Sequence, residues 1–165
     1  MHQDFESGAG PRIAGLYRYP VKGFSAEPLR SVTLELGQTF PNDRRFAVEN
    51  GPGRFDPEAP RHLPKTNFIM LMRNERLATL KTRYIDETDT WVIQRDGRQV
   101  AQGQLTSRIG RQLVEQFLAA YLKDDLRGPP RLLEAAGHSF SDVAVKCAHI
   151  ISLSSLRMLE RVAGR

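Results

Sequence analysis

The dipeptide Asp96–Gly97 limits the fold of this chain more than any other feature of its sequence. It lies between two runs of β-type residues, 90–95 and 98–101, and Asp-Gly favours the tight turn of a two-residue hairpin. Short runs of similar pattern recur upstream, most of them followed by glycine, proline or asparagine. The pattern from residue 12 to about residue 103 therefore predicts a mainly β region.

Further strands are predicted in four upstream segments: residues 13–17, 30–36, 45–49 and 77–85. The segment 30–36 alternates strictly, which would place Val32, Leu34 and Leu36 on one face. The apolar run 68–72 fits either a strand or a buried turn of helix. Between Gly51 and Pro64, prolines and glycines predict an irregular segment whose length indicates a functional loop or a lid.

One amphipathic helix is predicted over residues 107–122, with Thr106 or Ser107 as its N-cap. Its apolar stripe consists of residues that recur every four positions, together with two neighbours: Ile109, Leu113, Phe117, Tyr121, Val114 and Leu118. The run Arg127-Gly128-Pro129-Pro130 ends this region and predicts a boundary.

The last part of the chain predicts a strand at 131–133, a polar loop at 137–142, a strand at 143–153 and a helix capped by Ser154. Leu156, Leu159 and Val162 would face inward, and Gly164 would end the helix. These elements cannot form a stable sheet alone, so they either pack on the first region or begin a longer domain. We favour the second reading. It predicts a flexible tail at 1–11, one domain at 12–126 and the truncated start of another at 127–165.

Charge and composition narrow the class of ligand. The chain carries 24 Lys and Arg against 19 Asp and Glu, a net charge of +5. Arginine favours phosphate and carboxylate ligands, and the chain lacks the dense basic run that would indicate nucleic-acid binding.

No apolar run is long enough for a membrane-spanning helix. Cys147 is the single cysteine, which excludes an internal disulfide and a multi-cysteine zinc site and fits a reducing compartment such as the cytoplasm.

Lys22 and Gly23 follow the predicted first strand, which Pro20 ends. A lysine at this position can contact a phosphate as a point charge, while the glycine lets a ligand approach the backbone. The alternative is a solvated loop lysine with no ligand.

Arg44 precedes the predicted strand 45–49. If residues 45–49 form a strand, its period of two places Arg44 on the same side as Phe46 and Val48, and an arginine on an apolar face must be paired or bind a ligand. Asp43 is the natural partner; the alternative is that Arg44 simply points to water. We expect Lys22 and Arg44 to form one anion site.

Three other residues are candidate acids, ligands or nucleophiles: His138, His149 and Cys147. His138 lies in a loop with Ser139, Ser141 and Asp142, and hydroxyls that hold the loop together explain this better than a catalytic triad. His149 and Cys147 lie on the predicted strand 143–153, where a structural role is the default for both.

These stretches resemble the MOSC family, named for the molybdenum-cofactor sulfurase C-terminus. The matching motifs are Leu16-Tyr17-Arg18-Tyr19-Pro20-Val21-Lys22, Asp43-Arg44-Arg45-Phe46, Phe140-Ser141-Asp142 and Ile150-Ile151-Ser152-Leu153-Ser154-Ser155-Leu156. The resemblance implies a mainly β fold with α (α+β): a MOSC-type N-terminal β-barrel with one amphipathic helix, followed by the start of a second barrel.

The resemblance also implies a ligand and a role. It implies binding of the molybdenum cofactor, molybdopterin, through Lys22, Gly23, Arg44, Ser141 and Asp142, and pyridoxal phosphate binding at the level of the family. The parent protein would be an oxidoreductase or a sulfur carrier, with an electron-transfer or sulfurase partner. Relatives take their metal ligand from a cysteine beyond residue 165, so the role does not pass to Cys147 and this chain alone is expected to be inactive.

A second hypothesis is a non-catalytic β-barrel module in which the loop 51–64 binds a protein partner or another small anion. Nucleic-acid binding through the net charge is a third and weaker one. Lys22 and Arg44 on opposite faces would favour the second hypothesis over the first.

Overall fold

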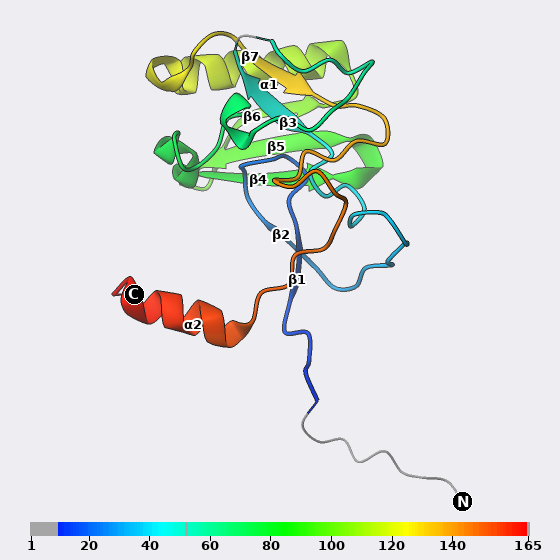
Figure 1. The fold of residues 1–165 in the computed structure, drawn as a ribbon. Helices are drawn as coiled ribbons and strands as arrows, with labels where there is room; N and C mark the ends of the chain where they lie inside the picture. Colours follow the sequence, from blue (N-terminus) through cyan, green and yellow to red (C-terminus); the bar gives the residue numbers. More distant parts are fainter. Residues whose placement is uncertain (1–9, 52, 165) are drawn as a thin grey trace, which may run out of the picture.

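The structure is a computed structural model that describes residues 10–51 and 53–164. Within these residues it contains three small antiparallel sheets and two α-helices (Figure 1). The strands are β1 (Leu16–Arg18), β2 (Glu27–Leu29), β3 (Ala47–Asn50), β4 (Leu80–Ile85), β5 (Thr90–Arg95), β6 (Arg98–Gln104) and β7 (Pro130–Leu133), and the helices are α1 (Arg108–Tyr121) and α2 (Leu153–Val162). The predicted α+β class is confirmed. The predicted tail 1–11 lies largely outside the described residues.

The largest sheet has the order β4-β5-β6 and contains the predicted hairpin. Asp96 and Gly97 both have positive φ, +51° and +74°, as the tight two-residue turn requires. Strand β5, the central strand, buries three consecutive residues, Trp91, Val92 and Ile93, of which Trp91 and Ile93 belong to the larger of two hydrophobic clusters.

Helix α1 packs against β6 and β7, and Ser107 caps it by accepting a hydrogen bond of 3.0 Å from Gly110 N. The predicted apolar stripe is buried only in part: Val114 and Leu118 are buried, and Phe117 and Tyr121 pack against the core. Ile109 and Leu113 are exposed, whereas Gly110 is buried against Gly103 of β6. A Cβ on Gly103 would lie 2.1 Å from Gly110 O, so the two glycines let helix and strand touch and fix which side of the helix faces inward.

Strand β3 pairs with β7 and separates two hydrophobic clusters. Because adjacent residues of a strand face opposite ways, Val48 contributes to the larger cluster and Ala47 to the smaller one. Strand β7 divides its residues in the same way: Leu132 contributes to the larger cluster and Leu133 to the smaller one. The segment that starts the predicted second unit therefore completes the core of the first, while the domain boundary itself stays a prediction.

The strand predicted at 30–36 is wrong. The chain pairs earlier, as β2 with β1, and residues 31–35 have no regular structure. Leu34 and Leu36 are exposed. An alternating pattern forms a strand only where a neighbour supplies backbone partners, and this segment pairs with none of the described strands.

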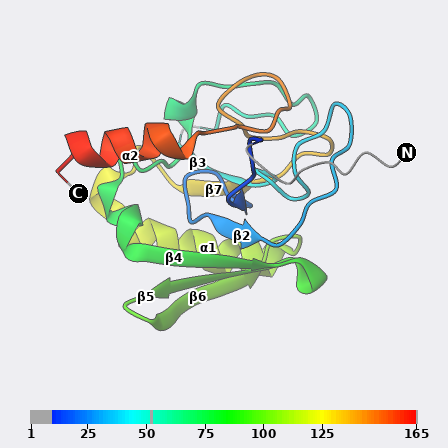
Figure 2. The same cartoon turned by 90° about the horizontal axis from the view of Figure 1, so that it is seen from below.

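The strand predicted at 143–153 is also wrong, and Cys147 and His149 are exposed in a segment without regular structure. Helix α2 begins one residue before the predicted cap Ser154, because Ser152 accepts a hydrogen bond of 3.1 Å from Ser155 N. The apolar residues predicted to face inward, Leu156, Leu159 and Val162, are exposed. Figures 1 and 2 show the reason: α2 follows an extended segment that leaves the sheets, so no described element covers its apolar side.

The ambiguous segment 68–72 is neither strand nor helix. Phe68 forms an isolated bridge with Glu49, and Phe68, Ile69 and Met70 are buried before the chain turns. The described residues between 51 and 64 are irregular, as predicted, and Pro52 lies outside the described residues.

Candidate functional site

The two stretches expected to form one site lie side by side. Arg44 N donates to Tyr19 O at 2.7 Å, and Lys22 N donates to Phe46 O at 2.9 Å. Val21 and Phe46 form a parallel bridge between these contacts. The chain just after β1 is therefore fixed by main-chain hydrogen bonds to the chain just before β3.

Arg44 does not lie on the strand. Its φ is +51° and β3 begins at Ala47, so the guanidinium does not share a face with Phe46 and Val48 as the sequence had suggested. Asp43 is its partner, as predicted: Arg44 Nη1 donates to Asp43 Oδ2 at 2.6 Å. The guanidinium also stacks on the ring of Tyr19, 4.8 Å from its centroid. Asp43 Oδ1 in turn accepts a hydrogen bond of 2.6 Å from Tyr19 N, which orients the arginine.

Lys22 is buried, so the solvated loop lysine is ruled out. Its Nζ donates to Phe140 O at 2.8 Å and to Asp142 Oδ1 at 2.5 Å. The same ammonium lies 5.7 Å from the centroid of the Phe68 ring. A buried ammonium requires such partners, and here they come from a loop more than a hundred residues away in the chain.

Gly23 has a role in packing. Its φ is +83°, and a Cβ at this position would lie 2.7 Å from Ile69 O. The backbone that approaches Gly23 in the structure is that of Ile69 and Met70. Any contact between Gly23 and a ligand stays a prediction.

The loop that contains Ser141 and Asp142 is attached to the same site. Phe140 N donates to Arg44 O at 2.8 Å, which brings the loop against the start of β3. The side chain of Asp142 is 64% exposed although it pairs with Lys22. Ser141 Oγ donates to Val143 O at 2.6 Å, so this hydroxyl holds the loop.

Charges around Asp142 reveal a residue that sequence reasoning missed. Burial lowers the pKa of Lys22, against the effect of its hydrogen bond to Asp142, and the charges of Arg44 and Lys65 lower it further. The pKa of Asp142 is lowered mainly by the hydrogen bond from Lys22, and also by the charges of Arg44 and Lys65. Lys22 contacts this carboxylate, and the charges of Arg44 and Lys65 act on it as well. No motif marked Lys65, which follows the irregular loop; its carbonyl accepts a hydrogen bond from the N–H of Phe68, whose ring lies near Lys22 Nζ.

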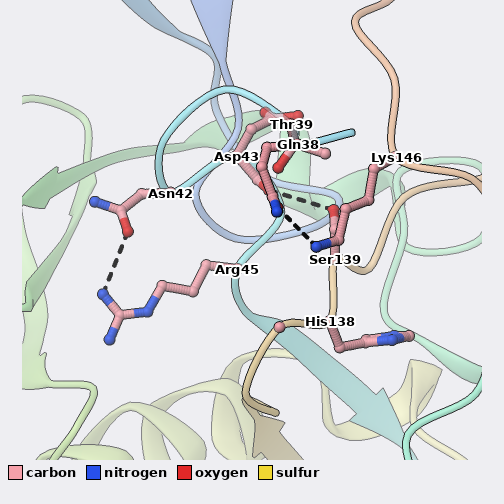
Figure 3. Close-up of a pocket in the computed structure, with 9 residues that line it drawn as sticks. Gln38, Thr39, Asn42, Asp43, Arg45, His138, Ser139 and Lys146 are labelled. Atoms are coloured by element: carbon pink, nitrogen blue, oxygen red, sulfur yellow. Dashed lines mark hydrogen bonds between the residues drawn. The ribbon is translucent and has the colours of Figure 1, made fainter. Parts of the chain in front are cut away.

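A small pocket of about 150 Å³ borders Asp43 (Figure 3). Its lining is polar: Gln38, Thr39, Asn42, Asp43, Arg45, Gly137, His138, Ser139 and Lys146. The cations there are engaged within the protein. Lys146 Nζ donates to Gln38 Oε1 at 2.7 Å, and Arg45 pairs with Glu134 and Asp89. Neither Lys22 nor Arg44 lines this pocket, so the candidate anion site does not coincide with it.

His138 packs against aromatic rings. Its imidazole lies 4.8 Å from the Phe140 ring and 5.2 Å from the Phe55 ring, and Figure 3 shows it turned away from Arg45. Burial, followed by the charges of His62 and Lys146, lowers its pKa. Ser139 Oγ donates to Asp43 O at 3.4 Å. These contacts support the interpretation that the loop's polar groups hold it in place.

Within residues 10–51 and 53–164, no group of three or more His, Cys, Asp or Glu side chains is arranged to hold a metal ion. In the same part of the chain, no helix combines the length and apolarity that crossing a membrane requires.

Comparison with known families gives one match. The profile described as the MOSC N-terminal beta barrel domain matches residues 10–142, which include Lys22, Arg44, Lys65 and Asp142. No curated protein and no solved structure matches the chain.

Proposed function

The chain belongs to the family of the MOSC N-terminal beta barrel domain, and on that premise we propose that it binds the phosphate end of the molybdenum cofactor, molybdopterin. The family is associated with molybdenum-cofactor sulfurases. The parent protein would then be an oxidoreductase or a sulfur carrier for the cofactor, with an electron-transfer or sulfurase partner, in the cytoplasm.

The observation that carries the proposal is that Phe140 links the two cations: Lys22 Nζ donates to Phe140 O, and Phe140 N donates to Arg44 O. The charges of Arg44 and Lys65 also act on Asp142, which pairs with Lys22. An ammonium and an oriented guanidinium are the side chains that bind phosphate best, the first as a point charge and the second through two parallel donors. Asp43 and Tyr19 already hold the Arg44 guanidinium, which reduces the entropy that it loses on binding.

The donor set fits the phosphate of the cofactor and not its metal. The described residues supply cations at this site but no cluster of metal-ligating side chains. When bound, the cofactor supplies the redox or sulfur-transfer chemistry of its molybdenum. The residues of this chain would bind and orient the phosphate, and the same cations would accept the phosphate of pyridoxal phosphate.

The alternative of a non-catalytic binding module has less support. Lys22 and Arg44 on opposite faces would have favoured it, but both residues bond to Phe140: Lys22 Nζ donates to Phe140 O, and Phe140 N donates to Arg44 O. The charge of Arg44 also acts on the pKa of Lys22, as expected for neighbours.

Production in two hosts tests the proposal. The full chain is purified from a host that makes molybdopterin and from one that does not. Its pterin is then oxidised and measured by fluorescence, and its molybdenum is measured by mass spectrometry. We expect pterin only in protein from the competent host. Folded protein from that host that carries no pterin would contradict the proposal.

A further inference from the structure

We infer that Asp142 is a displaceable internal anion, which occupies the place of the ligand's phosphate among Lys22, Arg44 and Lys65 and leaves when a phosphate binds. The inference rests on the proposed function, because it concerns how the same site takes its ligand. It assigns to Asp142 the role of a competitor of the ligand, and it adds Lys65 to the binding cations.

The hydrogen-bond donors of Lys22 are largely occupied. An ammonium has three N–H groups. One is donated to Phe140 O at 2.8 Å and one to Asp142 Oδ1 at 2.5 Å, and the ring of Phe68 lies 5.7 Å away. Lys22 itself is buried, so a phosphate oxygen cannot approach Nζ from a free side. A ligand phosphate must therefore replace one of the present partners.

Of the two hydrogen-bond partners of Lys22, Asp142 is the one that can leave. Phe140 is buried, its N–H donates to Arg44 O, and its ring packs against the rings of Phe55 and Phe68. Its carbonyl is therefore fixed. The side chain of Asp142, in contrast, is 64% exposed against 6% for Lys22. The carboxylate can therefore rotate into water, where hydration compensates much of the lost pairing.

The charge balance also favours displacement. The positive charges of Lys22, Arg44 and Lys65 act on Asp142, and Asp43 pairs with Arg44, so two carboxylates face three cations. A phosphate carries up to two negative charges and offers more acceptor oxygens than a carboxylate. The exchange of Asp142 for phosphate therefore improves the charge balance and supplies acceptors for the Arg44 guanidinium as well.

A phosphate titration of the full chain tests the inference. Inorganic phosphate is added at constant ionic strength, and the backbone ¹H–¹⁵N signals of Gly23 and Arg44 report binding. The variant Asp142→Asn keeps the shape of the side chain and removes its charge. Asp96→Asn is the matched control, since it removes the same charge from the exposed hairpin, where asparagine tolerates the positive φ.

We expect Asp142→Asn to bind phosphate about fivefold to tenfold more tightly than the wild type, whereas Asp96→Asn binds with unchanged affinity. In the Asp142→Asn background, Lys65→Gln should weaken phosphate binding about threefold or more, which would identify Lys65 as the third binding cation.

Three results would overturn the inference. If Asp142→Asn binds phosphate no more tightly than the wild type, Asp142 does not compete with the ligand. The proposed anion site would remain. If Lys65→Gln does not weaken phosphate binding, Lys65 is not one of the binding cations. If phosphate shifts neither Gly23 nor Arg44 in any variant, the proposed function fails together with the inference.

Discussion

The buried ammonium of Lys22 donates a hydrogen bond of 2.5 Å to the carboxylate of Asp142, which lies 120 residues further along the chain. Lys22 follows β1 and Asp142 follows β7, so the pair exists only once β3 and β7 have paired between them. The two partners differ in environment, since the lysine is buried and the aspartate is largely exposed. The two ends of the pair should therefore respond differently to substitution.

Replacement of the buried end should cost more stability than replacement of the exposed end. Lys22→Met leaves the carbonyl of Phe140 without its donor, and we expect the free energy of unfolding to fall by about 1–2 kcal/mol. Asp142→Asn retains an acceptor at the exposed end, so its cost should stay at about 0–1 kcal/mol. Urea unfolding of both variants measures the difference. The opposite order would show that Asp142 contributes more to the fold than its exposure suggests.

Gly23→Ala should be strongly destabilising, by about 2–4 kcal/mol, because the new Cβ meets Ile69 O at 2.7 Å in a backbone conformation with φ of +83°. Gly37→Ala is the matched control. Gly37 has a similar φ of +74° but no atom within 4 Å of a Cβ, so only the backbone strain of about 1 kcal/mol applies. Equal losses in thermal unfolding would show that the contact with Ile69 is not the reason for the glycine.

Gly110→Ala should destabilise the protein although alanine is the better helix former. Helix propensity alone predicts a gain of about 1 kcal/mol in the interior of α1. A Cβ on Gly110 would lie 2.2 Å from Gln104 O, and this clash with the backbone of β6 should outweigh the gain. Gln112→Ala, on the exposed side of the same helix, is the control and should be neutral. A stabilised Gly110→Ala variant in thermal unfolding would contradict the close packing of α1 on β6.

Acid should weaken the contact between Asp86 and Arg18. Arg18 donates to both carboxylate oxygens, at 3.0 and 2.7 Å, and this pairing lowers the pKa of Asp86. The folded-state pKa therefore lies below the unfolded value of about 3.9. The stabilisation is complete above the unfolded pKa and is lost as the pH falls through the folded pKa.

Asp86→Asn should therefore be less stable than the wild type at pH 7 and should lose less stability on acidification below about pH 4. Chemical unfolding at a series of pH values measures both effects. Asp96→Asn, on the exposed hairpin, should follow the wild-type curve. Parallel curves for Asp86→Asn and the wild type would contradict the assignment of the acid-sensitive pair.

Local chemistry explains which parts of the fold could be predicted from the sequence. Asp96–Gly97 defines its hairpin because few other residues accept two positive φ values in succession. Ser107 defines the start of α1 through a hydrogen bond within the same turn. The strand prediction for residues 30–36 was wrong because an alternating pattern does not show whether a neighbouring strand exists.

The candidate site likewise has a part that could be predicted from the sequence and a part that could not. The sequence placed Lys22 and Arg44 together and named Asp43 as the partner of Arg44, because these residues lie within short motifs. It could not show that Lys22 is buried or that Asp142 is its counter-ion, since both depend on pairing between segments far apart in the chain. Lys65 was missed for the same reason.

The most direct test of the account is the amount of molybdopterin that purifies with the Lys22→Met variant, relative to the wild type, from a host that makes the cofactor. Arg98→Gln, which removes a positive charge from the distant β5–β6 hairpin, is the control. We predict that Lys22→Met retains about one tenth of the wild-type pterin or less, because a charge-assisted hydrogen bond to phosphate is lost, and that the control retains all of it. Equal pterin in folded wild type and Lys22→Met would contradict the central claim that this lysine holds the phosphate.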